Sequence, residues 1–132
     1  NVAQHRTASV IHDPQSPDYI VQRPRVAASG EGWKELILGE NEQLYFSLRR
    51  LDFETECPQD THGERFHVLA LVDGDHVRVR SVAHPERSFD MDYLDIVCVP
   101  AEMGEYVIEN LGKEPVMVHK TMLRDGYQEV VL

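Results

Sequence analysis

The sequence predicts a single all-β domain of the jelly-roll type, and three observations support this. Short apolar or alternating segments recur with turn-forming residues between them, a spacing typical of a sandwich or barrel. We find no segment with the periodicity of an amphipathic helix of three turns. The 132 residues also suffice for one domain that buries its own core without a disulfide or a structural metal.

The segment of residues 65–80 is the centre of this prediction. It consists of an apolar run, the turn Asp73-Gly74-Asp75, and an alternation of valine with arginine. Because glycine accepts the positive φ of a tight turn, an Asp-Gly pair between two β-type runs predicts a hairpin. The first arm is apolar in both phases, as in a strand covered on both faces. In the second arm the valines should point inward, and Arg78 and Arg80 to solvent, opposite acidic cross-strand partners.

The remaining elements follow from turn residues and β-type runs. Residues 1–32 contain three prolines and a glycine-rich stretch, so we expect an irregular N-terminal arm with short extended pieces at Ala8–His12 and Asp18–Gln22. Residues 33–132 then form the jelly-roll domain. Within it we expect strands at Trp33–Leu38, Gln43–Glu54, Leu94–Val99, Glu105–Glu109 and Val116–Leu123, and loops at Thr55–Gly63 and Ala83–Arg87.

The strand expected at Gln43–Glu54 changes phase. Its first three apolar residues share one face and its last two share the other, in the order Leu44, Phe46, Leu48, Leu51 and Phe53. One extra residue in a strand returns such a pattern to a single face, so we predict a β-bulge near Arg49-Arg50.

Charge and composition exclude several classes of function. The formal net charge is −10, which argues against non-specific binding to nucleic acid or to anionic membranes. No apolar run approaches the roughly 20 residues that span a bilayer, and no signal-peptide pattern opens the chain. Cys57 and Cys98 form no CxxC motif, and Cys98 is expected to be a core thiol. We therefore expect a cytoplasmic protein with reduced thiols; a single disulfide is the alternative.

The sequence from about residue 43 to residue 123 resembles the cupin superfamily. When Gly74 is aligned with the last glycine of the first cupin motif, G-x5-H-x-H-x3,4-E-x6-G, the three ligand positions fall at Asp60, His62 and His67. In the second motif, G-x5-P-x-G-x2-H-x3-N, Pro100 matches the proline and Glu105 falls at the histidine. The spacing is cupin-like, whereas most ligand identities differ from the family pattern.

A closer resemblance is to the C-terminal cupin region of type I mannose-6-phosphate isomerases. The matching segments are Tyr45–Leu51, Phe66–Gly74 and Val99–Tyr106, the last reading Val-Pro-Ala-Glu-Met-Gly-Glu-Tyr. The catalytic zinc of that family belongs to its N-terminal cupin region, whose Gln/His/Glu/His ligand set we do not find here. The chain begins at Asn1 rather than Met, so we expect a fragment or a processed product.

The alignment predicts a metal site made by Asp60, His62, His67 and Glu105. Two imidazoles and two carboxylates suit zinc first, or manganese, iron or nickel. The alternative is that these are ordinary strand and loop residues, with Glu105 explained by the family's Gly-Glu-Tyr turn.

The isomerase resemblance also implies residues for a sugar phosphate. Glu105 would be the catalytic base if it does not bind the metal. Tyr106 would form a wall of the pocket, with its hydroxyl near the opening. The candidate phosphate anchors are cationic, although each also fits an exposed strand-face charge: Arg49, Arg50, Arg65 and Lys120.

Three functions stay open at this point. The first is a domain that binds or isomerises a sugar or sugar phosphate, with aldose–ketose isomerase activity if metal is bound. The second is a non-catalytic cupin module for small-molecule binding or dimerisation, and the third an independent metal-dependent cupin enzyme such as an oxygenase or epimerase. We also expect a homodimer, because the doubly apolar central strand and the arm of residues 1–32 are suited to contact a second subunit.

Overall fold

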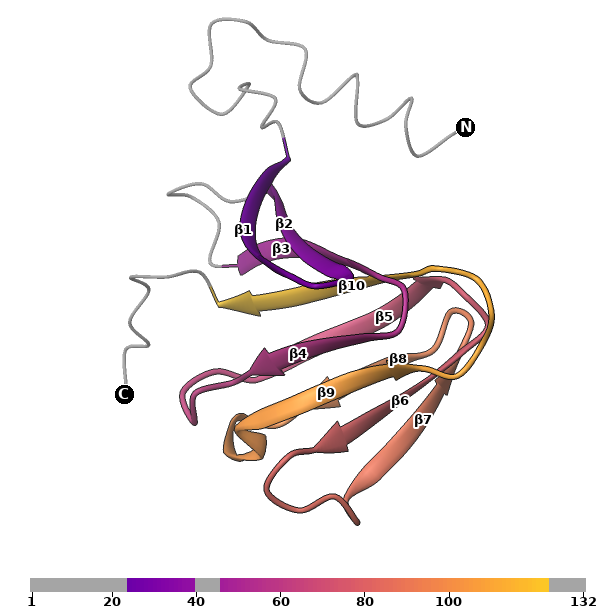
Figure 1. The fold of residues 1–132 in the computed structure, drawn as a ribbon. Helices are drawn as coiled ribbons and strands as arrows, with labels where there is room; N and C mark the ends of the chain where they lie inside the picture. Colours follow the sequence, from indigo (N-terminus) through magenta and orange to yellow (C-terminus); the bar gives the residue numbers. More distant parts are fainter. Residues whose placement is uncertain (1–23, 40–45, 124–132) are drawn as a thin grey trace, which may run out of the picture.

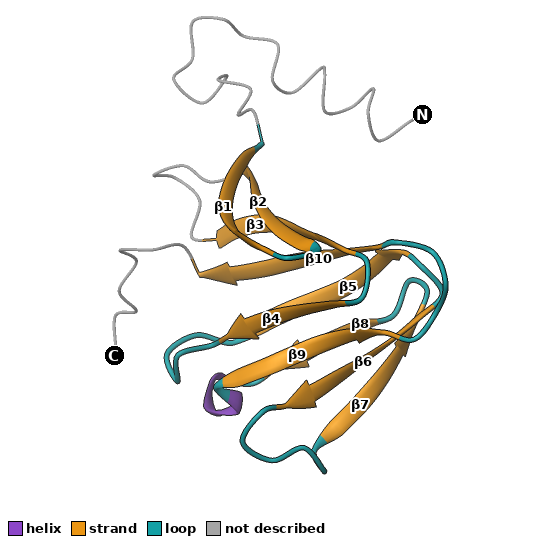
Figure 2. Cartoon of the chain, viewed as in Figure 1, coloured by secondary structure: helices purple, strands orange, loops and turns teal. Residues whose placement is uncertain are grey.

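The computed structural model describes residues 24–39 and 46–123, and these residues are almost entirely β-structure. They contain no α-helix and one short 3₁₀ turn at Ala101–Met103 (Figure 2). None of the described helical structure is long and apolar enough to cross a membrane. The strands are β1 Arg25–Gly30, β2 Trp33–Gly39, β3 Phe46–Phe53, β4 Glu56–Asp60, β5 His67–Asp73, β6 His76–Ser81, β7 Ser88–Asp92, β8 Ile96–Val99, β9 Glu105–Asn110 and β10 Val116–Leu123.

The strands form two antiparallel sheets. A six-stranded sheet has the order β1-β2-β3-β10-β5-β8, and a four-stranded sheet has the order β4-β9-β6-β7 (Figure 1). Strands distant in sequence are neighbours in both sheets: β10 lies between β3 and β5, and β9 lies between β4 and β6. The all-β jelly-roll prediction is therefore confirmed.

The predicted hairpin of residues 65–80 is wrong in one respect. β5 pairs with β10 and β8, whereas β6 pairs with β7 and β9, so the Asp73–Asp75 turn carries the chain from one sheet to the other. Glycine is still required there, since Gly74 has φ 126° and an added Cβ would lie 3.1 Å from Val116. A tight turn with glycine suits a corner between sheets as well as a hairpin, and the strand partners decide between them.

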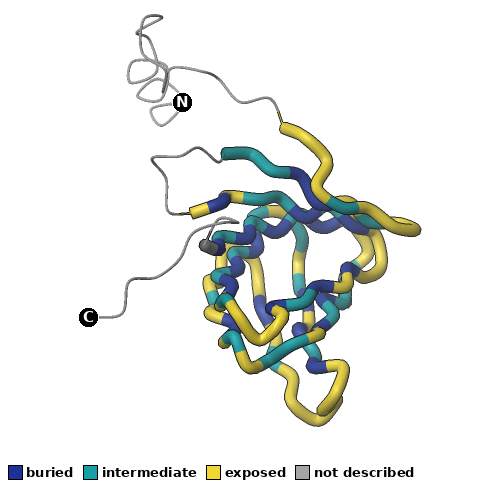
Figure 3. The backbone as a smooth tube through the Cα atoms, turned by 90° about the vertical axis from the view of Figure 1, so that its left-hand side faces the viewer, coloured by how far each residue is buried: buried dark blue, intermediate teal, exposed yellow. Residues whose placement is uncertain are grey.

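The alternation along β6 is confirmed. Its two valines are fully buried, and its arginines pair with acidic residues on the neighbouring strands. Arg78 Nε lies 2.8 Å from Asp90 Oδ1, and Arg80 Nε lies 2.7 Å from Glu109 Oε1. Figure 3 shows the same alternation of buried and exposed positions along other strands.

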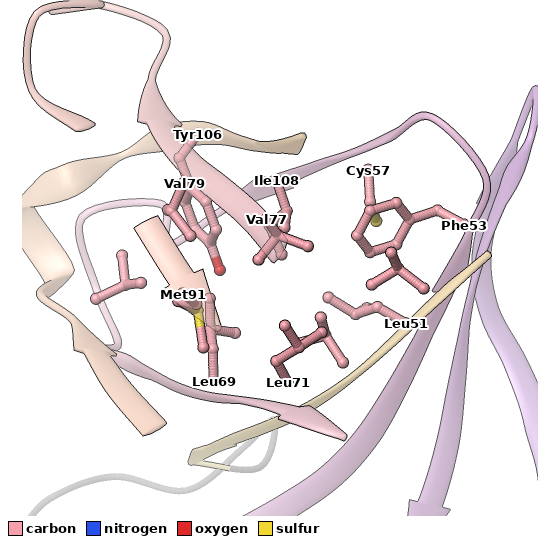
Figure 4. Close-up of a cluster of buried hydrophobic side chains, with 13 residues drawn as sticks. Leu51, Phe53, Cys57, Leu69, Leu71, Val77, Val79, Met91, Tyr106 and Ile108 are labelled. Carbon is pink, nitrogen blue, oxygen red and sulfur yellow. The ribbon is translucent and has the colours of Figure 1, made fainter. Parts of the chain in front are cut away.

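The core lies between the two sheets, where side chains from both point toward one another (Figure 4). Cys57 belongs to this core and is fully buried. The prediction that Cys98 is a core thiol is wrong: Cys98 lies on the outer face of β8, opposite Val68 of β5, and is exposed. The core members are Leu51, Phe53, Cys57, Leu69, Leu71, Val77, Val79, Met91, Val99, Tyr106, Ile108, Val116 and Val118.

The predicted bulge in β3 is also wrong. β3 pairs with β10 in unbroken register from Phe46 to Phe53. Leu51 and Phe53 face the core, whereas Phe46 and Leu48 lie on the outer face with 48% and 37% of their surface exposed. Leu44 lies outside the described residues. The inner positions toward the start of β3 are therefore polar, Ser47 and Arg49, a feature on which the site below depends.

Three strands were not predicted as such. β1 lies within the expected arm of residues 1–32 and pairs with β2, whereas the expected pieces at Ala8–His12 and Asp18–Gln22 lie outside the described residues. β4 occupies part of the expected loop Thr55–Gly63 and is an edge strand, a place that tolerates its Pro58. β7 is the other edge of the same sheet and carries few apolar residues.

Candidate functional site: the polar end of the barrel

The inner faces of the strands are apolar at one end of the barrel and polar at the other. Because β3 and β10 are antiparallel and in register, Arg49 lies opposite Lys120 while Leu51 lies opposite Val118. The same change occurs along β5, where His67 follows the inward positions of Leu69 and Leu71 toward this end. We call this region the polar end; its inward side chains are Glu35, Ser47, Arg49, Gln59, Thr61, His67, Ser81, Tyr106 and Lys120.

A cavity of about 530 Å³ opens at the polar end. Strands of both sheets contribute to it, and most of the inward polar residues belong to its lining. This volume lies in the range of small-molecule sites, which is about 300–1,000 Å³.

A buried ion-pair network forms one wall of the cavity. Lys120 Nζ lies 2.9 Å from Glu35 Oε2, and Arg49 Nη1 donates to the same oxygen over 2.8 Å. Gln59 Nε2 donates to Glu35 Oε1 over 3.2 Å, while Gln59 Oε1 accepts from Lys120 Nζ. The side chains of Lys120 and Glu35 are only 4% and 6% exposed. A charge buried to this degree persists only with a partner, and here one carboxylate serves two cations.

The network alters the pKa values of its members. Burial raises the pKa of Glu35, but its contacts with Lys120, Arg49 and Gln59 outweigh burial and hold the pKa below the ordinary value. For Lys120 the balance is the reverse: burial and the positive charge of Arg49 together lower the pKa, and the contacts with Glu35, which raise it, do not compensate fully.

His67 and Tyr106 form a second buried pair. His67 Nδ1 lies 2.6 Å from the Tyr106 hydroxyl, and the two rings pack edge to face with centroids 5.7 Å apart. Burial, and then the positive charge of Lys120, lowers the pKa of His67 to about 4. Burial raises the pKa of Tyr106 well above its ordinary value. At neutral pH both groups are therefore uncharged.

Thr61 fixes the rim of the cavity. Its hydroxyl donates to the carbonyl of Ala101 over 2.5 Å and accepts from the amide of Gly104 over 2.9 Å. Its own amide donates to the carbonyl of Gly104. These bonds join the end of β4 to the 3₁₀ turn before β9, so the rim residues Asp60 and Glu105 lie on adjoining segments.

The structure brings most of the predicted site residues to one cavity. Arg50 is the exception: it points to the outer face of β3 and pairs with Asp52 over 3.1 Å. Lys120, for which an exposed strand-face charge was the alternative, is buried. The predicted residues that line the cavity are Arg49, Asp60, His62, Arg65, His67, Glu105, Tyr106 and Lys120.

The four predicted metal ligands are not placed as one metal-binding group in the part of the chain that the structure describes. Within residues 24–39 and 46–123, no three side chains of His, Cys, Asp or Glu are placed to hold one metal ion. Asp60 accepts from the amide of His62 over 2.7 Å and lies 3.3 Å from its imidazole, while His67 is bonded to Tyr106. Lys120 and Arg49 add positive charge beside His67. The donors and the local charge therefore do not suit a divalent cation.

Sequence reasoning did not identify Glu35 and Gln59. Each is a polar residue at an inward position of its strand. Glu35 is two residues after Trp33 on β2, and Gln59 is two residues from both Cys57 and Thr61 at β4. Lys120 lies between Val118 and Met122 in the same manner. A polar residue at an inward position near a strand end is the signal that could have identified this network.

Comparisons with known proteins define the fold. No protein-family model matches the sequence, and a search of curated proteins finds no match. Among solved structures, the cupin domain of Cnp3 from Schizosaccharomyces pombe matches with TM-score 0.54 and 23% identity over 70% of this chain and 65% of that chain. A cupin-2 domain from Rhodospirillum rubrum matches with TM-score 0.60 and 9% identity over 80% and 72% of the two chains. The chain has the cupin fold.

A third cupin match is a sugar phosphate isomerase from Silicibacter pomeroyi. Its TM-score is 0.54, with 14% identity over 79% of this chain and 71% of that chain. At such identities the likeness shows the fold alone, and the specific link to mannose-6-phosphate isomerases stays a prediction.

The buried histidine predicts a dependence of stability on pH. Below the ordinary pKa of 6.5, the unfolded chain binds a proton at His67 that the folded chain, with a pKa of about 4, does not bind. The free energy of unfolding should therefore fall as the pH falls from 6.5 to 4. His67→Gln should reduce this loss by on the order of 2 kcal/mol, measured by urea unfolding across the window.

The same substitution at an exposed histidine is the control. His84 is 53% exposed and lies outside the cavity, so His84→Gln should keep the pH dependence of the original protein. Equal losses of stability in the original protein and in His67→Gln would contradict the assignment of His67 as a buried neutral group.

Proposed function

We propose that this chain is a cupin domain that binds a sugar phosphate in the cavity at the polar end, and that binding needs no metal ion. The observation that carries the proposal is the buried pair of cations, Lys120 and Arg49, held on one carboxylate in the cavity wall. In this proposal the cations supply the positive charge for an anionic ligand.

The lining matches the two parts of a sugar phosphate. Arg49, Arg65 and Lys120 are the cationic members, and guanidinium groups favour phosphate because they can donate two parallel hydrogen bonds. Glu35 and Gln59 supply oxygen acceptors and an amide donor of the kind that binds sugar hydroxyls. The lining also carries three carboxylates, Glu35, Asp60 and Glu105, so the preference for an anionic ligand depends on the inner wall, where Lys120 and Arg49 share the carboxylate of Glu35.

One of the solved structures with this fold supports the choice of a sugar phosphate as the ligand. The protein from Silicibacter pomeroyi that shares the fold is described as a sugar phosphate isomerase. A relation to mannose-6-phosphate isomerases in particular rests on the sequence segments given above.

Two adjacent arginines on β3 test the proposal. Arg49 faces the cavity and Arg50 faces outward, so the same substitution probes both faces of one strand. By calorimetry in the presence of a chelator, we expect the original protein to bind fructose 6-phosphate more tightly than fructose. Arg49→Met should weaken binding of the phosphate about tenfold or more, the worth of one charge-assisted hydrogen bond.

Arg50→Met should leave the affinity for fructose 6-phosphate within about twofold, as for a surface charge remote from the ligand. Equal affinity for the phosphate and the neutral sugar, or equal losses in the two variants, would contradict the proposal. Binding that disappears with the chelator would contradict its metal-free form.

A second candidate function is dimerisation, and the outer face of the six-stranded sheet favours it. Two rows of residues in register cross this face, Leu48–Thr121–Val68–Cys98 and Arg50–His119–Ala70–Ile96. Most residues of these rows are apolar, Thr121 and His119 are polar, and Arg50 is charged. We call the two rows without Arg50 the outer apolar face. Ile96 is 71% exposed there. The solvent face of an antiparallel sheet is ordinarily polar, so this surface suits a protein contact.

Charge favours a second copy of the chain as the occupant. Each chain carries a net charge of −10, so two copies repel unless they meet where acidic residues are absent. Neither row contains an acidic residue, and Asp52, which lies next to them on β3, is paired with Arg50. The outer face of the four-stranded sheet carries Asp90, Asp92 and Glu109. A two-fold contact must be complementary to itself, and an uncharged apolar face meets that requirement.

A single substitution tests the dimer. We expect sedimentation at micromolar concentration to give the mass of two chains, and Ile96→Glu to give that of one chain with the fold retained. Val82→Glu is the control, because Val82 is exposed but belongs to neither row. The mass of one chain for the original protein, or dimers in Ile96→Glu, would contradict this candidate.

A further inference from the structure

We propose that His67 is a catalytic residue of the cavity, oriented by Tyr106, and that it moves a proton at a carbon next to the carbonyl group of the bound sugar phosphate. This inference rests on the proposed function, because it assumes that the cavity holds such a ligand. It assigns the base role to His67 rather than to Glu105, which lies on the exposed rim.

The hydrogen bond to Tyr106 fixes the imidazole and leaves one ring nitrogen for a ligand. His67 lines the cavity, and its Nδ1 is bonded to the Tyr106 hydroxyl over 2.6 Å. Its Nε2 makes no hydrogen bond to any residue in the described ranges. It is also not one of the fully buried polar atoms that lack a partner there, so it is open to the cavity. Both side chains are buried, so the ring has a fixed orientation.

The pair can hold a proton at either ring position. When Nδ1–H donates to the Tyr106 oxygen, Nε2 carries a lone pair and can accept a proton from the ligand. After that transfer the imidazolium keeps its bond to Tyr106, since Nδ1–H still donates to the same hydroxyl oxygen. Because the pKa of His67 is lowered to about 4, the ring is uncharged at neutral pH, and in the tautomer with the proton on Nδ1 its Nε2 can accept a proton.

Lys120 is placed to assist at the carbonyl oxygen. Lys120 pairs with Leu69, so it and His67 are diagonal inward neighbours on adjacent strands β10 and β5. As Nε2 takes the proton, the C–H electron pair forms a carbon–carbon double bond and the carbonyl oxygen becomes anionic. The ammonium of Lys120 stabilises that oxygen by a hydrogen bond. The ammonium also gives a proton to that oxygen and recovers one from the hydroxyl group on C1, so return of the proton from the imidazolium to C2 leaves a carbonyl group at C1 and converts the ketose to the aldose.

The test is hydrogen exchange in deuterated water with fructose 6-phosphate as the probe. We expect the protein to accelerate replacement of the C1 hydrogen by deuterium, followed by proton NMR, with a chelator present. His67→Gln should slow this exchange about 100-fold or more, the contribution of a positioned base. Tyr106→Phe keeps the ring and removes only the hydroxyl, so it should slow exchange less while leaving binding nearly unchanged. His84→Gln should exchange at the original rate.

The outcomes separate this inference from the proposed function. Calorimetric binding of the probe without accelerated exchange overturns the inference and leaves the proposed function standing. Exchange that persists in His67→Gln but is lost in Glu105→Gln assigns the base to Glu105 and also overturns it. If the probe does not bind, the proposed function and this inference both fail.

Discussion

The contact between Lys120 and Glu35 is the interaction on which the site depends. Two charges removed from water persist only when they pair and when their remaining hydrogen-bonding capacity is used. Here Gln59 and Arg49 complete that requirement, so four side chains from β2, β3, β4 and β10 must meet at one point. The network therefore ties both sheets together at the polar end. It also contributes to the charge of the cavity, and Lys120 adds to the effect of burial in lowering the pKa of His67.

The apolar end of the barrel supplies the stability that lets the polar end hold buried charges. Leucine, valine and phenylalanine side chains from both sheets fill that half and supply the hydrophobic stabilisation of the domain. The polar half can then hold charged groups whose burial contributes little to stability. Thr61 holds the loops at the rim in place by hydrogen bonds, so the cavity keeps its opening. In this division one end of the barrel stabilises the fold, and the other holds the cavity in which we propose that a ligand binds.

The sequence allowed the fold to be predicted because much of its evidence is local. The alternation in β6 and the run of β10 were visible in residues 76–81 and 116–123. The cavity was anticipated through the cupin resemblance, which placed Asp60, His62, His67 and Glu105 at one opening. The partners of Lys120 could not be predicted, since Gln59 lies 61 positions away and no local pattern joins them. The β3 error has the same origin: Ser47 and Arg49 face inward because distant strands satisfy them.

We propose that the inner wall of the cavity is positively charged because Lys120 and Arg49 share the carboxylate of Glu35, and that the donors around His67 are arranged for hydrogen bonding rather than for a metal ion. Elemental mass spectrometry of the protein, purified without chelator and then exposed to zinc, manganese, iron and nickel before desalting, tests this directly. We predict far less than one bound ion per chain, with no gain in thermal stability from any of the four metals. One tightly bound ion per chain that is lost on substituting His67 would contradict the account.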